Sequence, residues 1–180
     1  IIFSDFRHGI FHRNSTEKFC NYISKKTFKI ADSQVASRWG NITEFKNFDL
    51  ITPNEKEARF SLADQDSTVG GLAGLLKKKT KYKNIILKLG SRGIVCCSGN
   101  VPEIYSIGSF TDNVLDAVGS GDALLAYSSL ILKTTNSIVA AGIIGSIAAA
   151  CECEIDGNKP INVDLVLQKI DSIEKKTQYN

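Results

Sequence analysis

Short apolar runs of β type alternate along this sequence with longer amphipathic stretches of helical type. Strands are expected at residues 1–4, 28–32, 49–52, 84–89, 94–98 and 103–107. Helices are expected at residues 15–26, 54–62, 69–79, 121–133, 137–150 and 163–175. This alternation is typical of an α/β fold with a largely parallel sheet, and it ends in consecutive helices.

Three local signals refine this pattern. The Ser-Arg-Gly sequence at residues 91–93, between two strand runs, predicts a hairpin. Pro53 and Asn54 mark the end of a strand and the start of a helix. The glycine-rich run at residues 70–74 is similar to a phosphate loop, but a leucine-rich helical pattern follows it and no strand immediately precedes it, which favours a helix start.

Size and composition indicate an ordinary globular protein with one domain over residues 1–180. The chain has 43% hydrophobic residues and a net charge of +3 from 22 basic and 19 acidic residues. The basic run at residues 77–83 reads as a solvated helix end, so no nucleic-acid partner is expected. No apolar run reaches about 18 residues and no secretory signal is recognisable, so we expect a cytoplasmic protein without a membrane partner.

Cysteine usage points to reduced thiols. The five cysteines are an odd number and form no pattern typical of a secreted disulfide framework. Cys96 and Cys97 lie in a strand run and are expected on opposite faces. Cys151 and Cys153 follow an alanine-rich helix without a nearby histidine, which favours core packing over a zinc site.

The chain contains no methionine and begins directly with a strand-like segment at residues 1–4. It therefore reads as a piece of a longer protein.

The segment with the clearest chemistry is a Gly-Ser-Gly turn followed by a long helical run. Gly119, Ser120 and Gly121 place backbone amides at a helix N-terminus, where an anion is favoured. The segment lacks the Lys-Ser/Thr pair of a Walker A loop and the third glycine of a dinucleotide fingerprint. Asp122 follows directly, and from the residues alone it is equally an acid at a phosphate site or a simple helix N-terminal carboxylate.

Residues 116–122, Asp-Ala-Val-Gly-Ser-Gly-Asp, resemble the second signature of the ribokinase-like (PfkB) carbohydrate kinases. The resemblance implies that Asp122 is the catalytic base, which takes the proton of a sugar hydroxyl as that hydroxyl attacks the γ-phosphate of ATP. It also implies that the amides of Gly119, Ser120 and Gly121 form an anion hole. Both roles suit phosphoryl transfer, which depends on positioning and on donors aimed at developing negative charge.

The same resemblance implies a site for a monovalent cation such as K⁺. Asp116 and the Val118 carbonyl fall where relatives often hold this cation. Ala117, in place of the usual hydroxyl residue or proline, and Tyr127, in place of a small residue, depart from the pattern.

An upstream segment resembles the family's Asn-x-x-Glu element. In relatives, residues corresponding to Asn54 and Glu57 organise the water shell of Mg²⁺ on the nucleotide phosphates. The spacing of three is also that of a helix-capping box, and the two interpretations are compatible.

Two further elements resemble nucleotide-binding parts of the family. Lys88, Gly90, Ser91 and Gly93 match the strand-turn element beside the nucleotide, although alone they indicate only a hairpin turn. Ser146, in an alanine-rich helix, and Gly157 after it match the wall around the adenine. Relatives commonly have asparagine where Ser146 stands.

The opening of the chain resembles one branch of the family. Residues 4–9 and 31–33 are most similar to the sugar-phosphate or heptose-phosphate kinases. His8 and His12 have metal-ligand spacing, but Gly9 between them and the lack of a clear third ligand favour a polar loop near the substrate.

Taken together, the resemblance implies a ribokinase-like three-layer α/β/α fold whose N-terminal part and lid are absent from this chain. It implies ATP-dependent phosphorylation of a sugar or sugar phosphate, with Mg²⁺ as cofactor and with little turnover by these residues alone. A non-catalytic nucleotide-binding module and one part of a bifunctional kinase/nucleotidyltransferase are the alternatives. A homodimer is the assembly that we expect.

Overall fold

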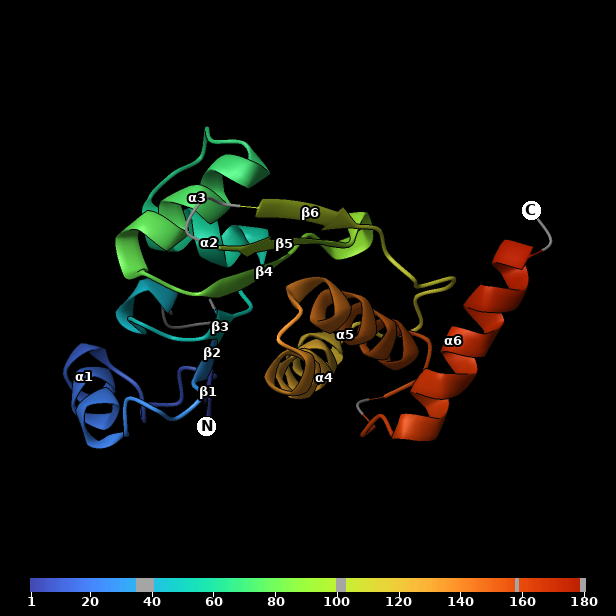
Figure 1. Ribbon diagram of the computed structural model, residues 1–180, viewed down its shortest axis with the longest axis horizontal. Helices are drawn as coiled ribbons and strands as arrows, with labels where there is room; N and C mark the ends of the chain where they lie inside the picture. The colour runs from blue at the N-terminus through green and yellow to red at the C-terminus, as the bar shows by residue number, and fades with distance from the viewer. Residues whose placement is uncertain (35–40, 100–102, 158, 179–180) are drawn as a thin grey trace. The chain divides into compact units, whose positions relative to one another are not determined.

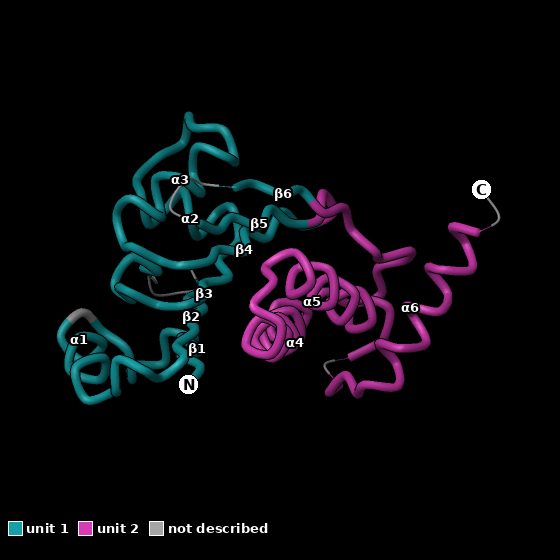
Figure 2. Tube along the Cα trace, viewed as in Figure 1, with its two compact units in different colours: residues 1–90, 94–106 teal, residues 91–93, 107–180 magenta. Residues whose placement is uncertain are grey.

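The chain divides by its internal contacts into two compact units. A computed structural model describes residues 1–34, 41–99, 103–157 and 159–178. Unit 1 comprises residues 1–90 and 94–106, and unit 2 comprises residues 91–93 and 107–180 (Figure 2). This division does not test the expectation of a single domain over residues 1–180, which stays a prediction.

Unit 1 is built on a six-stranded sheet whose strands are arranged in chain order (Figure 1). The strands are β1 (Ile2–Asp5), β2 (Ile30–Ser33), β3 (Leu50–Ile51), β4 (Asn84–Lys88), β5 (Ile94–Ser98) and β6 (Glu103–Ile107). Strands β1 to β4 pair in parallel, and β5 runs antiparallel to β4. The expected α/β fold with a largely parallel sheet is therefore confirmed.

Two helices, α2 (Glu55–Leu62) and α3 (Val69–Thr80), form the connection between β3 and β4. Their buried residues share one core with alternate residues of the strands. The core residues from the helices are Ala58, Leu72, Ala73 and Leu76, and those from the parallel strands are Phe3, Ala31, Ile51, Ile85 and Leu87. Alternate residues of the strands thus pack one face of the sheet against α2 and α3.

Helix α1 (Arg13–Tyr22) lies between β1 and β2 and differs from the expected span of residues 15–26. It begins earlier because His12 caps it: the Ser15 amide donates to His12 Nδ1 at 3.4 Å, and the His12 amide donates to Ser15 Oγ at 2.9 Å. It ends earlier because Ile23 adopts an extended conformation, with φ of −86° and ψ of 132°. Local capping, which the apolar pattern did not register, sets both bounds.

The turn predictions agree with the structure. Strands β4 and β5 form the predicted hairpin, joined by a short 3₁₀ turn at Gly90–Arg92. Thr68 caps α3 by accepting the Gly71 amide at 3.1 Å, so the glycine-rich run at residues 70–74 lies inside the first turns of a helix. The interpretation of that run as a helix start is confirmed.

The described residues of unit 2 form three α-helices: α4 (Ser120–Thr135), α5 (Ile138–Cys153) and α6 (Val163–Gln178). Helices α4 and α5 approach closely where Gly145 faces Ser128, whose hydroxyl donates to the Ala141 carbonyl at 2.9 Å. Helix α6 packs against α5 through a smaller apolar cluster that includes Ile147, Cys151 and Val166. In the described part of the chain, no helix is both long and apolar enough to cross a membrane.

The cysteines are free thiols. Cys97 belongs to the core with α2 and α3, while its neighbour Cys96 points to the other face of the sheet, as expected. Burial raises the pKa of the Cys96 thiol to about 12, which keeps it protonated. Cys151 and Cys153 lie in the last turn of α5 and do not follow it as expected, because that helix continues to Cys153.

Candidate active site

The Gly-Ser-Gly turn opens helix α4 in unit 2. Gly119 has a left-handed conformation, with φ of 87°, that favours glycine, and α4 starts at the next residue. The Gly119 carbonyl accepts the amides of Asp122 and Ala123, both at 2.9 Å. Of the first two helical residues, Ser120 has an amide that donates to the Ala117 carbonyl outside the helix, at 3.4 Å, and the Gly121 amide has by position no intrahelical acceptor. The start of this 16-residue helix is thus suited to an anion.

Asp122 lies in the first turn of α4 and is exposed. A carboxylate there interacts favourably with the helix dipole, and an exposed one is accessible to a substrate hydroxyl. The turn therefore brings together the four residues that the sequence pairs as base and anion hole: Gly119, Ser120, Gly121 and Asp122.

Asp116 organises the segment before this turn. Its Oδ1 accepts the Val118 amide at 2.9 Å, and its own amide donates to the Cys153 carbonyl at 3.2 Å. The Leu115 amide donates to the same carbonyl at 2.8 Å. The segment is therefore held at the C-terminus of α5. The cation role of Asp116 stays a prediction.

An ion-pair network that the sequence did not predict anchors the same segment to α6. Lys169 Nζ lies 2.9 Å from Asp112 Oδ2 and 2.7 Å from Glu154 Oε1, and Lys176 Nζ lies 2.9 Å from Asp112 Oδ2. Hydrogen bonds from Lys176 and Lys169 lower the pKa of Asp112 to about 2. The two lysines are seven positions apart, so they share one face of α6, and this spacing was the available signal.

In unit 1, Asn54 and Glu57 form a complete capping box at the start of α2. The Glu57 amide donates to Asn54 Oδ1 at 2.8 Å, and the Asn54 amide donates to Glu57 Oε2 at 2.7 Å. The capping interpretation is confirmed. Each of these oxygens has two lone pairs, so the box is compatible with water-mediated contact to a magnesium ion. That second role stays a prediction.

Lys88, at the end of β4, makes an ion pair with Asp32 at the end of β2. Its Nζ lies 3.2 Å from Asp32 Oδ1 and 3.4 Å from Oδ2. The Thr52 hydroxyl donates to the same Oδ1 at 3.0 Å. Asp32 and Thr52 are both buried, and neither was predicted as a site residue. The signal that indicates them is that both lie at the carboxyl ends of parallel strands.

The glycines of the strand-turn element differ in their surroundings. A Cβ on Gly93 would lie 2.1 Å from the Ile107 carbonyl oxygen, so only glycine fits this contact between two backbone segments. Gly90 has φ of 63° and open space around it. At Gly93 the glycine thus serves a contact within the chain, and close approach of a nucleotide to these glycines stays a prediction. Nucleotide contacts of Lys88, Gly90, Ser91 and Gly93 stay predictions.

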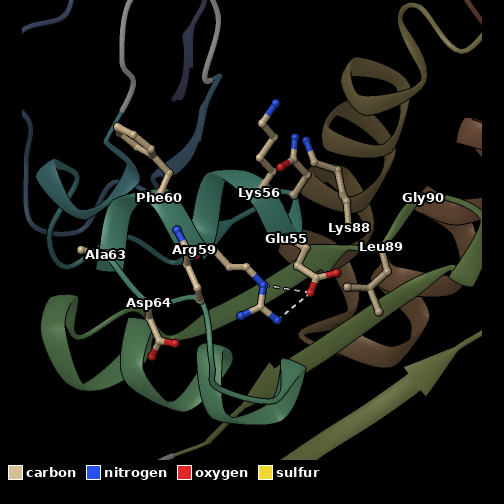
Figure 3. Close-up of a pocket in the computed structure, with 11 residues that line it drawn as sticks. Glu55, Lys56, Arg59, Phe60, Ala63, Asp64, Lys88, Leu89 and Gly90 are labelled. Carbon is tan, nitrogen blue, oxygen red and sulfur yellow. Dashed lines mark hydrogen bonds and ion pairs between the residues drawn. The ribbon is translucent and has the colours of Figure 1, made fainter.

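A cavity of about 990 Å³ lies in unit 1 beside the start of α2. Three sequence-predicted residues line it, Asn54, Lys88 and Gly90, together with Glu55, Lys56, Arg59, Phe60, Ala63, Asp64, Gln65 and Leu89. Arg59 is paired with Glu55 at 2.7 Å (Figure 3). In that view the Lys56 and Lys88 side chains extend away from this pair. The cavity therefore has cationic groups in its wall.

A second polar network lies at the carboxyl end of β1. Asp5 is buried and accepts hydrogen bonds from the Ser33 hydroxyl and the Arg7 amide, both at 2.9 Å. The Arg7 guanidinium pairs with Asp5 Oδ2 at 2.8 Å. Asp5, Arg7 and Ser33 thus pair with one another within unit 1.

The two residues predicted at the adenine differ in their surroundings. Ser146 is buried in α5, and its Oγ has no hydrogen-bond partner among the described residues. Gly157 has φ of 77°, and a Cβ there would meet nothing within 4 Å. Both roles stay predictions.

Curated relatives share sequence with most of this chain. It is 26% identical over 154 residues to the "Bifunctional protein HldE" of Campylobacter fetus subsp. fetus, and the match covers 83% of this chain and 32% of that protein. It is 28% identical over 156 residues to the protein of the same name from Helicobacter hepaticus, covering 83% and 31%. The chain thus spans about a third of the length of these relatives.

Solved structures share the fold. Ribokinase from Thermotoga maritima superimposes with a TM-score of 0.76 at 22% identity, covering 94% of this chain and 56% of that one. Phosphofructokinase-2 from Escherichia coli, in complex with potassium, gives a TM-score of 0.77 at 16% identity, covering 91% and 53%. The ribokinase-like character of the fold is therefore confirmed.

Residues 16–160 match the profile described as pfkB family carbohydrate kinase. The match covers most of both units and includes residues 54–57 and 116–122. The chain therefore belongs to the pfkB family of carbohydrate kinases.

Proposed function

We propose that this chain supplies the nucleotide-binding and base-bearing part of an ATP-dependent kinase that phosphorylates a hydroxyl of a sugar or sugar phosphate. The observation that carries the proposal is the start of α4, where Asp122 follows a left-handed Gly119 and amides without intrahelical acceptors. The resemblance of residues 4–9 and 31–33 to sugar-phosphate kinases favours a sugar phosphate as acceptor, and the relatives named bifunctional protein HldE favour a bifunctional parent protein. The acceptor and the parent's second activity are part of the proposal.

In the proposed reaction, Asp122 accepts the proton of the acceptor hydroxyl. The hydroxyl oxygen forms a bond to the γ-phosphorus of ATP, the bond from that phosphorus to the β–γ bridging oxygen breaks, and ADP leaves with the electron pair. The amides at Ser120 and Gly121 stabilise negative charge on the transferred group. Phosphoryl transfer needs little covalent chemistry from the protein, so positioning and charge stabilisation by these residues are sufficient roles.

The proposed metal roles fit the donors that are present. Asn54 and Glu57 would hold Mg²⁺ through its water shell, because both side chains carry oxygens and magnesium keeps several waters. Asp116 and the Val118 carbonyl would hold a monovalent cation, since both offer oxygen. Bound magnesium would neutralise phosphate charge, while the protein groups position the nucleotide.

The substitution Asp122→Asn tests the base. General-base loss lowers turnover by about 10²- to 10⁴-fold, so we expect kcat to fall by at least about 100-fold while ATP affinity changes by less than about threefold. The measurements are steady-state kinetics with candidate sugar phosphates and ATP titration by calorimetry.

Asp164→Asn is the matched control, because Asp164 also lies in the first turn of a helix, α6. If Asp122 were only a helix N-terminal carboxylate, both substitutions would lower the free energy of unfolding by about 0.3–1 kcal/mol. Neither substitution would then change kcat from its wild-type value. Equal kcat for Asp122→Asn and wild type would overturn the base assignment. ATP binding without any turnover by the wild-type parent would favour the non-catalytic module.

A further inference from the structure

Three polar side chains share one face of the sheet at the carboxyl ends of neighbouring strands: Asp32 of β2, Thr52 after β3 and Lys88 of β4. Side chains alternate between the faces of a sheet. The residues that directly precede these three in sequence belong to the core with α2 and α3: Ala31, Ile51 and Leu87. Asp32, Thr52 and Lys88 therefore lie on the face opposite to that core.

Along this face of the sheet, the side chains change from apolar to polar within two positions on each strand. Two positions before each polar residue stands a buried isoleucine or leucine: Ile30, Leu50 and Ile86, which are 2%, 0% and 0% exposed. The change from apolar to polar thus occurs on all three strands at their carboxyl ends. Ligands of open parallel sheets bind outside these ends.

The three residues form a connected network. Thr52, which is fully buried, donates its hydroxyl hydrogen to Asp32 Oδ1 at 3.0 Å. Lys88 Nζ lies 3.2 Å and 3.4 Å from the two oxygens of the same carboxylate. Asp32 therefore has its orientation set from one side by Thr52 and in turn restrains the ammonium group.

The ammonium group retains donor capacity. Lysine carries three N–H donors, and one carboxylate at these distances takes at most two of them. Within the described part of the chain, Asp32 is the hydrogen-bond partner recorded for Lys88 Nζ. The side chain is 17% exposed and lines the cavity with Asn54 and Gly90. At least one N–H group is therefore available to a ligand.

Stability alone is a weak reason for such a pair. A buried ion pair loses so much hydration that an apolar replacement of similar volume is often as stable. Lys83 and Asp49 form a comparable pair near the opposite, amino ends of β3 and β4, at 2.6 Å, but Lys83 is 74% exposed. The Lys88 side chain is by contrast only 17% exposed, and an ammonium group held in this way suits a phosphate ligand.

We propose that Asp32, oriented by Thr52, is the positioning residue that fixes the ammonium group of Lys88 for contact with the phosphate chain of the nucleotide. This inference rests on the proposed kinase function and deepens it. The one feature that carries it is the Thr52–Asp32–Lys88 network at the carboxyl ends of three strands, beside the cavity.

Asp32 has two opposed effects on an anionic ligand. Its carboxylate aligns the ammonium group, which favours transfer, but its negative charge repels the phosphates. Removal of this charge should therefore preserve or tighten ATP binding while it slows turnover. A purely structural role would not separate the two quantities in this direction.

The first test compares ATP with adenosine as ligands. Lys88→Met should weaken ATP binding by roughly 10- to 100-fold, the usual loss for a hydrogen bond to a charged group, and leave adenosine binding unchanged. Lys88→Arg keeps the charge and should bind ATP within about tenfold of wild type. The control Lys83→Met should bind both ligands as wild type does. Thermal unfolding of each variant checks that it is folded.

The second test is a double-mutant cycle in kcat. Asp32→Asn should bind ATP at least as tightly as wild type and lower kcat by roughly 10-fold or more. The double variant Asp32→Asn/Lys88→Met should have the kcat of Lys88→Met alone, because Asp32 acts through Lys88. Turnover is measured in the form that gives wild-type activity, whether the 180-residue chain or the longer polypeptide that carries it.

The outcomes separate the two proposals. Wild-type protein that neither binds ATP nor transfers phosphate rejects the kinase function itself. Wild-type binding with an unchanged ATP affinity in Lys88→Met rejects the inference and leaves the kinase function standing. The inference is also rejected, and the kinase function stands, if the fold-losses in kcat of the two single variants multiply in the double variant. Asp32 would then act independently of Lys88.

Discussion

Tyr82 shows how a single side chain joins distant parts of unit 1. It is 1% exposed, and its hydroxyl donates to the Ile42 carbonyl, 40 positions earlier in the chain. Burial raises the pKa of the phenol well above its ordinary value of about 10. The hydroxyl therefore remains a protonated donor across the physiological range.

We predict that Tyr82→Phe lowers the free energy of unfolding by about 1–3 kcal/mol, because the Ile42 carbonyl loses its donor inside the core. Urea denaturation at pH 7 measures this loss. The folded state holds the phenol proton more tightly than the unfolded state, so wild-type stability should also decline as pH rises above about 10. The variant should lack that part of the decline.

Tyr105→Phe is the control for this substitution. Tyr105 is 40% exposed and donates to Glu103 at 3.0 Å on the surface. We expect a change within about 0.5 kcal/mol. Equal losses in the two variants would contradict a specific role for the Tyr82 hydrogen bond.

The hydrogen-bond partners of a residue could be predicted from the sequence only where both residues are close together in the chain. Asn54 and Glu57 are three positions apart, and their capping box follows from that spacing. Lys88 and Asp32 are 56 positions apart, and no local rule pairs them. Their meeting depends on the strand order, which places β2, β3 and β4 side by side.

At the scale of the elements, the contact between helices α4 and α5 depends on the absence of a side chain at Gly145. A Cβ on Gly145 would lie 2.0 Å from Ser128 Oγ and 3.1 Å from the Leu124 carbonyl oxygen. The serine hydroxyl is itself bonded to the Ala141 carbonyl, so it cannot move without loss of that bond. The close approach of the helices therefore requires glycine at position 145.

We predict that Gly145→Ala lowers the free energy of unfolding by about 1–3 kcal/mol through overpacking. Gly74→Ala is the matched control, because Gly74 is also inside a helix, α3, but has open space at its Cβ position. It should raise stability by roughly 0.5–1 kcal/mol, since alanine favours the helix. Thermal and urea unfolding of both variants measure the opposite signs, and a gain in Gly145→Ala would contradict the contact.

Element types were predictable, and their ends were less so. Apolar periodicity predicted the six strands and six α-helices that the described residues form. The His12 cap and the extended Ile23 set the bounds of α1, and continued packing carried α5 through Cys153. Such ends depend on individual hydrogen bonds and contacts, which a periodic pattern does not contain.

At the scale of the whole molecule, the chain spans only part of the proteins that it resembles. It covers about a third of its HldE relatives and 56% of the Thermotoga ribokinase chain. We predict that the 180 residues bind ATP but turn over little alone, and that mixing with the matching amino-terminal portion of the parent restores transfer. The assay is ADP release with Mg²⁺, ATP and candidate sugar phosphates. Full turnover by the isolated chain would contradict this expectation.

The order of strand and helix types, the glycine turn before Asp122 and the capping box at Asn54 were determined by the sequence alone, because each depends on residues close together in the chain. Only the tertiary structure decided which charges meet, as in the Asp32–Lys88 pair and the link from Asp112 to α6. Such pairs join residues more than 50 positions apart, and the fold alone brings them within hydrogen-bond distance.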